Sequence, residues 1–125
     1  MRVGRAYTFQ SSHLLPNVPP GHKCGRLHGH TYGLEVEIAG RVDPTLGWLV
    51  DFALLDTIVD TVIVRELDHR HLNEIPGLEN PTSERLVDWI WDRLSAYGWP
   101  AHVDLARVRV SENGRSWAER APYEP

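Results

Sequence analysis

The chain has 125 residues, which fits one globular domain and is too short for two. Hydrophobic residues make up 42% and charged residues 24%, so wholesale disorder is disfavoured. Thirteen Lys and Arg against seventeen Asp and Glu give a net charge of −4, so we expect neither nucleic acid nor an anionic membrane as a partner. No apolar stretch approaches the ~20 residues that span a bilayer, and we expect no signal segment. With Cys24 as its only cysteine the chain forms no internal disulfide, which favours a reducing, cytoplasmic setting.

The first half of the chain predicts two strands and a helix. Residues 2–12 alternate between larger and smaller side chains, as a strand does, and a loop rich in Pro and Gly follows over residues 14–27. Residues 28–42 alternate again and end in a turn over residues 43–47. Apolar side chains at helical spacing then predict a helix over residues 52–67, capped by Asp51.

The second half predicts a helix and two more strands. Residues 68–80 form a loop, and a helix begins near Pro81 or Thr82 and ends before Gly98. Residues 103–110 alternate as a strand, and Asn113-Gly114 is a strong hairpin turn before a last strand over residues 116–119. The order β-β-α-α-β-β predicts an α+β domain over residues 1–125, an antiparallel sheet with two helices on one face. Open sheet edges make self-association a reasonable expectation.

Histidines form the first candidate site. His28 and His30 are two residues apart on a predicted strand, so they project from the same face. His13 ends the preceding strand, and an antiparallel return of the chain brings it beside them. Three imidazoles are the ligand set of a catalytic zinc with one open position. The alternative is a polar strand end with solvated rings.

Cys24 lies four residues before His28, between Lys23 and Arg26. This electropositive setting favours the thiolate and therefore a nucleophile or general base. A small buried hydrophobe and a fourth metal ligand are the alternatives.

Other polar residues have simpler interpretations on their own. Asp68 beside His69 can support proton transfer, although an exposed Asp-His pair after a helix is commonplace. Glu112 at a strand end is either solvated or a two-oxygen acceptor for a planar N–H array such as the edge of a pterin. Thr82 and Ser83 are interpreted first as capping residues of the second helix.

Three segments together carry a more specific pattern. They are PPGHKCGRLHGH at residues 19–30, LDH at 67–69 and LENPTSE at 78–84. With these segments the chain resembles the 6-pyruvoyltetrahydropterin synthase-like family over nearly its whole length. The short gap between Cys24 and the H-G-H motif favours the carboxypterin-forming branch. The chain departs from the family in having Asn113 where Thr is frequent and Arg120 where Tyr is frequent.

The resemblance implies a tunnelling fold (T-fold) whose subunits form barrels, two trimers stacking into a homohexamer with active sites at subunit interfaces. It implies that His13, His28 and His30 bind Zn²⁺. Cys24 would be the general base with Asp68 and His69 as its relay. The set that contacts the pterin would be Glu112, Thr82 and Ser83, and the candidates for the triphosphate are Lys23 and Arg26.

The implied activity is a zinc-dependent lyase of 7-deazaguanine and queuosine biosynthesis. Its small-molecule substrate is 7,8-dihydroneopterin triphosphate, and its products are 6-carboxytetrahydropterin, acetaldehyde and triphosphate. Two alternatives stay open: a synthase that eliminates triphosphate and forms a pyruvoylpterin, and a non-catalytic module that binds zinc or pterin.

Overall fold

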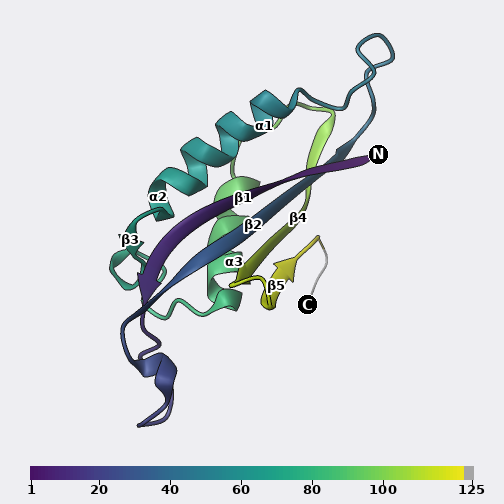
Figure 1. Ribbon diagram of the computed structural model, residues 1–125. Coiled ribbons are helices and arrows are strands. Elements are labelled where there is room, and N and C mark those ends of the chain that lie inside the picture. The colour runs from purple at the N-terminus through teal and green to yellow at the C-terminus, as the bar shows by residue number, and fades with distance from the viewer. Residues whose placement is uncertain (123–125) are drawn as a thin grey trace.

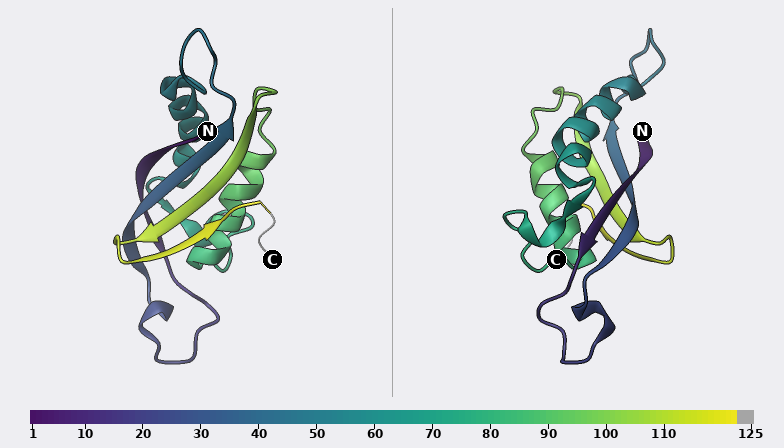
Figure 2. Two further views of the ribbon diagram at one scale, coloured as in Figure 1. Left: turned by 90° about the vertical axis from the view of Figure 1, so that its right-hand side faces the viewer. Right: turned by 60° about the vertical axis from the view of Figure 1, so that its left-hand side comes forward.

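The computed structural model describes residues 1–122, so the last three residues of the predicted domain lie outside the described residues. Its elements are β1 (Arg2–His13), η1 (Lys23–Gly25), β2 (His28–Gly40), α1 (Phe52–Val59), η2 (Asp60–Val64), α2 (Arg65–Leu67), β3 (Arg70–His71), η3 (Leu72–Glu74), α3 (Ser83–Ser95), β4 (Val103–Glu112) and β5 (Ser116–Arg120). One sheet of five strands has the order β3-β1-β2-β4-β5, and α1 and α3 lie on the same face of it (Figures 1 and 2). The predicted α+β class is confirmed.

The sheet differs from the prediction at its β3 edge. β1, β2, β4 and β5 pair antiparallel, as expected, but the predicted loop over residues 68–80 also contains β3. β3 pairs parallel to the end of β1, where Ser11 lies opposite Arg70 and Ser12 opposite His71. Two residues carry no periodic pattern of their own, so β3 is defined only by the strand beside it.

Both predicted helices are present, and both are capped as their sequences indicate. The Asp51 carboxylate accepts the N–H of Ala53 at the start of α1, and the Thr82 hydroxyl accepts the N–H of Arg85 at the start of α3. The first helix continues to Leu67, as predicted, but its segment η2 is a π-helix. A π segment shifts the later residues around the helix axis, which a strict 3.6-residue period does not anticipate.

The core lies between the inner face of the sheet and the helices. β2 contributes side chains with no exposed surface, and α3 packs against them with two leucines and one isoleucine that are equally buried. These residues are Tyr32, Leu34, Val36, Ile38, Leu86, Ile90 and Leu94. Each large apolar side chain buried in this way contributes about 1.5–3 kcal/mol of hydrophobic stabilisation. The helices thereby hold β1, β2 and β4 as a rigid platform.

The other face of the sheet carries charge. Arg107 on β4 pairs with Glu35 and Glu37 on β2, each at 3.3 Å, and Arg109 stacks on Trp117 with the guanidinium carbon 4.3 Å from the ring centroid. Such half-exposed pairs contribute little stability individually, but they keep this face polar. Within residues 1–122, no helix is long and apolar enough to cross a membrane.

Gly40 at the end of β2 offers a direct test of this packing. A Cβ atom at residue 40 would overlap the carbonyl oxygen of His102, which is backbone and cannot swing away. We expect Gly40→Ala to lower the free energy of unfolding by about 1–3 kcal/mol, measured by urea denaturation. Gly98→Ala is the control, since a Cβ atom at residue 98 would have nothing within 4 Å of it. Equal stability of the two variants would contradict this packing.

Candidate active site

The register of β1 and β2 brings three histidines together. His13, the last residue of β1, lies opposite His28, the first residue of β2, and Ser11 lies opposite His30. One ring nitrogen from each histidine falls within 4.8 Å of those of the other two. The predicted convergence of His13, His28 and His30 is therefore present, at the end of the sheet where the chain turns between the first two strands.

Two of these rings are oriented by backbone carbonyl groups. His13 Nδ1 lies 2.9 Å from the oxygen of Pro81, and His28 Nδ1 lies 2.7 Å from the oxygen of Arg26. Carbonyl oxygens only accept hydrogen bonds, so both rings carry their proton on Nδ1 and leave Nε2 as a lone pair. The two Nε2 atoms face one another at 3.0 Å, near the separation of about 3.3 Å for two nitrogens on a tetrahedral zinc. Two lone pairs this close repel one another unless a proton or a metal ion lies between them.

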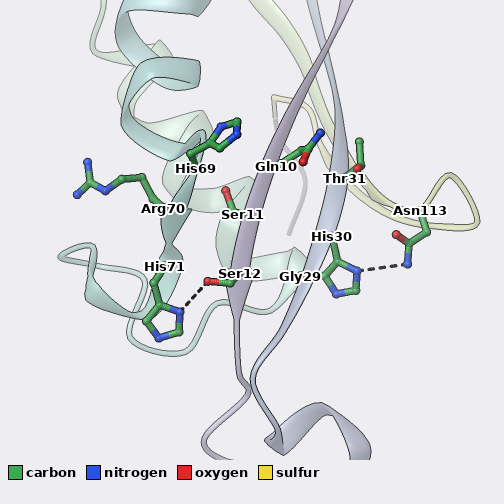
Figure 3. A pocket seen from close by; sticks show the side chains of 10 residues that line it. All are labelled: Gln10, Ser11, Ser12, Gly29, His30, Thr31, His69, Arg70, His71 and Asn113. Carbon is green, nitrogen blue, oxygen red and sulfur yellow. Dashed lines mark hydrogen bonds between the residues drawn. The ribbon is translucent and has the colours of Figure 1, made fainter.

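His30 completes the set from β2. Within residues 1–122, its buried Nε2 has no hydrogen-bond partner, and its Nδ1 lies 3.2 Å from the side-chain nitrogen of Asn113 (Figure 3). A buried ring nitrogen without a partner is costly unless something else binds it. The unpartnered nitrogen and the facing pair both fit a metal ion, so His13, His28 and His30 form a candidate metal centre.

The environment of His13 favours the form that binds metal. Burial lowers the pKa of His13, and the neighbouring His28 and His30 act in the same direction, against the backbone hydrogen bond to Pro81 and the charge of Glu112. A lowered pKa keeps the ring neutral near pH 7, and only a neutral imidazole has a lone pair to donate to a metal.

Glu112 links the metal centre to the start of α3. It ends β4 opposite Tyr32 of β2, and its Oε1 accepts a hydrogen bond of 2.9 Å from the Ser83 hydroxyl. Its Oε2 lies 3.7 Å from His30 Nε2. Ser83 is therefore more than a capping residue, whereas the Thr82 hydroxyl is occupied as the cap of α3. The Glu112 carboxylate is therefore held beside the histidines and can accept further hydrogen bonds.

The side chains of Asp68 and His69 contact each other at the edge of β1. The Gln10 N–H donates to Asp68 Oδ1 at 2.9 Å, and Asp68 Oδ2 lies 3.0 Å from His69 Nδ1. The hydrogen bond from Gln10, followed by that from His69, lowers the pKa of Asp68 and keeps it ionised. His69 has a φ of 56° and a side chain that is 78% exposed. The imidazole thus projects outward with its proton position set by a carboxylate.

The loop that carries Cys24 stands apart from this pair. It projects beyond the end of the sheet (Figures 1 and 2) and is closed by a bond from the Leu15 N–H to the Cys24 oxygen, at 2.8 Å. Within residues 1–122, no hydrogen bond joins the Cys24 thiol to Asp68 or His69, and the converging ligand set does not include Cys24. The half-buried thiol therefore lies outside the group of three converging ring nitrogens. Lys23 and Arg26 belong to the same loop.

An open hollow of about 640 Å³ lies beside the metal centre. It extends from Asn113 and His30 across the ends of β2 and β1 to the segment of residues 69–71 (Figure 3). His71 faces Ser12, whose Oγ lies 3.1 Å from His71 Nδ1, and Arg70 points away from His30. Lys23, Cys24 and Arg26 do not line the hollow. The exposed imidazole of His69 lies at one edge of the hollow.

Sequence reasoning missed Asn73, which fastens the loop to the rest of the site. Its side chain accepts from the Leu14 N–H at 3.0 Å and donates to the Leu14 oxygen at 2.9 Å. A third bond, of 3.3 Å, reaches the Glu79 oxygen. The only local signal was an Asn within a predicted loop, which usually means a turn.

Comparison with known proteins gives this geometry a context. Residues 2–122 match the family described as 6-pyruvoyl tetrahydropterin synthase. A protein of Archaeoglobus fulgidus provisionally named 6-carboxy-5,6,7,8-tetrahydropterin synthase is 40% identical, with 95% of this chain and 94% of that protein covered. A Synechocystis protein named 6-carboxy-5,6,7,8-tetrahydropterin synthase is 37% identical, with 93% and 89% covered.

Two further relatives widen the comparison. A Pyrococcus furiosus protein named dihydroneopterin monophosphate aldolase is 41% identical, with 74% of this chain and 76% of that protein covered. The structure of Caenorhabditis elegans 6-pyruvoyl tetrahydropterin synthase superposes with a TM-score of 0.84 at 25% identity, with 97% and 94% covered. The relatives therefore share the fold and differ in the reactions for which they are named.

The histidine cluster predicts stabilisation by a metal ion. We expect Zn²⁺ at about 100 times its dissociation constant to stabilise the metal-stripped protein by about 2.7 kcal/mol, seen as a higher Tm in a thermal melt. His30→Ala removes one ligand of the set and should remove most of this gain. The control is His71→Ala, which lies in the same hollow but faces Ser12. A His30→Ala protein stabilised as strongly as the His71→Ala protein would contradict the centre.

Proposed function

The chain belongs to the 6-pyruvoyl tetrahydropterin synthase family, and on that premise we propose that it is a zinc-dependent lyase. Its substrate is 7,8-dihydroneopterin triphosphate, and its products are 6-carboxy-5,6,7,8-tetrahydropterin, acetaldehyde and triphosphate, in 7-deazaguanine and queuosine biosynthesis. The observation that carries the proposal is the three-histidine centre with Glu112 held beside it, on a chain that matches relatives of that name over nearly its full length.

His13, His28 and His30 would hold Zn²⁺ through their Nε2 atoms. When bound there, the ion supplies a Lewis acid that favours loss of protons from the hydroxyl groups of the substrate side chain. The protein sets up this role in advance, because the carbonyl groups of Pro81 and Arg26 fix two of the rings in the binding tautomer.

Glu112 would hold the pterin ring. Ser83 restrains Oε1, which fixes the plane of the carboxylate and leaves it free to accept from adjacent N–H groups of the pterin. With Oε2 3.7 Å from His30 Nε2, a ring anchored there would place its side chain next to the metal centre. Ser83 is thus a positioning residue for Glu112, while Thr82 supports both by capping α3.

Cys24 would be the general base, with Asp68 and His69 as the relay that accepts and passes on its proton. Asp68 is ionised and holds the His69 ring, but within the described chain neither residue bonds to the thiol. We place the two halves of the relay on different subunits, in a homohexamer of two trimers. Within residues 1–122, the part of β1 before Ser11 pairs with β2 alone, so its other edge is available for closing a barrel.

A second candidate function follows from the Pyrococcus furiosus relative. The protein named dihydroneopterin monophosphate aldolase is 41% identical over 93 residues, and the same metal centre and pterin anchor suit a retro-aldol cleavage. That reaction differs in its products, because the aldehyde released still carries the phosphate. The pyruvoyl-forming synthase and the non-catalytic zinc or pterin module are the remaining alternatives.

One assay separates these activities. The zinc-loaded protein is incubated with 7,8-dihydroneopterin triphosphate and, in parallel, with the monophosphate, and products are read by mass spectrometry with trapping of aldehydes. We expect carboxytetrahydropterin and acetaldehyde in equal amounts from the triphosphate. A phosphorylated aldehyde from the monophosphate would establish the aldolase instead, and triphosphate release without acetaldehyde would establish the pyruvoyl synthase. If a folded, zinc-bound oligomer turned over neither substrate, the non-catalytic module that binds zinc or pterin would be the remaining interpretation.

The divided relay predicts that two inactive variants restore one another. Cys24→Ala and His69→Ala should each lose nearly all turnover yet keep their zinc, since neither residue belongs to the histidine cluster. When the two variants are dissociated and reassociated together at equal amounts, about a quarter of the interfaces combine an intact Cys24 with an intact His69. We therefore expect about a quarter of the wild-type rate.

The control is each variant taken through the same procedure alone. If both relay residues acted within one chain, every site in the mixture would lack one of them and no activity would return. Loss of zinc from Cys24→Ala would instead indicate that the thiol is a metal ligand.

A further inference from the structure

Each of the three histidines of the candidate metal centre has a neighbour at its Nδ1 atom, on the side of the ring away from the centre, and for one of the three that neighbour is a side chain. Each ring has Nδ1 engaged by a neighbouring group, which leaves Nε2 for the centre. For His13 and His28 that neighbour is a backbone carbonyl group, whereas for His30 it is the side chain of Asn113. Asn113 is therefore the only one of the three outer partners that a substitution can remove.

We propose that Asn113 is a positioning residue of the metal centre, and that its amide oxygen accepts the Nδ1 proton of His30 when metal is bound. This inference rests on the metal centre in the proposed function. Asn113 stands where Thr is frequent in the family that the sequence resembles, and the inference gives it a role in orienting His30. It gives Asn113 no contact with the substrate.

The role of Asn113 depends on which His30 nitrogen carries the proton. If the Asn113 nitrogen donates to Nδ1, the proton sits on Nε2, and a buried N–H without a partner points at the centre. If the amide turns over, its oxygen accepts from Nδ1 and Nε2 offers a lone pair. The two ends of a carboxamide have nearly the same shape, so the turn requires no movement of the backbone. The second arrangement matches that of His13 and His28.

The hairpin turn delivers this amide to His30. Asn113 has a φ of 53° and Gly114 a φ of 72°, and Asn-Gly is the pair that tolerates two such residues in a tight turn. Glu112, immediately before the turn, lies opposite Tyr32 on β2, which brings the side chain of residue 113 over His30 (Figure 3). The turn that joins β4 to β5 therefore also orients a metal ligand.

Substitutions at residue 113 test the assignment without breaking the turn. Asn113→Gly removes the amide and keeps a backbone that accepts a positive φ. Asn113→Asp keeps an oxygen acceptor and loses the donor. Thr31→Ala is the matched control, because the Thr31 side chain lines the same hollow and, within residues 1–122, makes no hydrogen bond to the His30 ring. The measurement is the dissociation constant for Zn²⁺, by competition with a chromophoric chelator on the metal-stripped protein.

We expect Asn113→Gly to bind Zn²⁺ about 10- to 100-fold more weakly than wild type, and Asn113→Asp and Thr31→Ala to bind at least as tightly as wild type. In nitrogen NMR of the zinc-loaded protein, the His30 Nδ1–H signal should shift between wild type and Asn113→Gly and stay unchanged in Thr31→Ala, which a merely structural role of Asn113 would not require. Wild-type affinity in Asn113→Gly, or equal weakening in Asn113→Asp and Asn113→Gly, would overturn the inference. A wild-type protein that does not bind Zn²⁺ would overturn the metal centre itself.

Discussion

The pairing of β1 with β2 is the constraint on which the rest of the structure depends. The register that sets His13 opposite His28 also turns Phe9, Leu34 and Val36 toward the helices. Because side chains alternate along a strand, a slip of one residue would send the core side chains to the charged face and separate the histidines. The hydrophobic core and the candidate metal centre thus depend on the same pairing.

The groups that surround the histidines come from the ends of elements rather than from their middles. Pro81 precedes α3, Arg26 precedes β2 and Asn113 begins the turn after β4. These ends are held by elements whose middles are buried, so the site is rigid although much of its surface is open. Such support keeps metal ligands in place before a metal or substrate arrives.

The candidate metal centre and the separate loop with Cys24 explain how one chain holds only part of the proposed machinery. Asn73 bonds the start of the loop at Leu14, while η1 with Cys24 extends past the end of the sheet. His69 projects into solvent from the edge of the hollow at residues 69–71. Within the described chain, no hydrogen bond joins the Cys24 thiol to Asp68 or His69, which is the basis for placing the relay across an interface.

Sequence by itself determined the elements of this protein and its candidate ligands. Alternation and helical periodicity predict β1, β2, β4, α1 and α3 because burial on one face leaves a periodic pattern in the chain. His-Gly-His predicts two ligands on one face because strand geometry repeats every two residues. Tertiary structure alone decided the partners of those ligands. Asn113 lies 83 residues from His30, and Pro81 lies 68 residues from His13. The Ser83–Glu112 bond, the parallel strand β3 and the separation of Cys24 from His69 likewise leave no local pattern, because each depends on where distant segments meet once the core has packed.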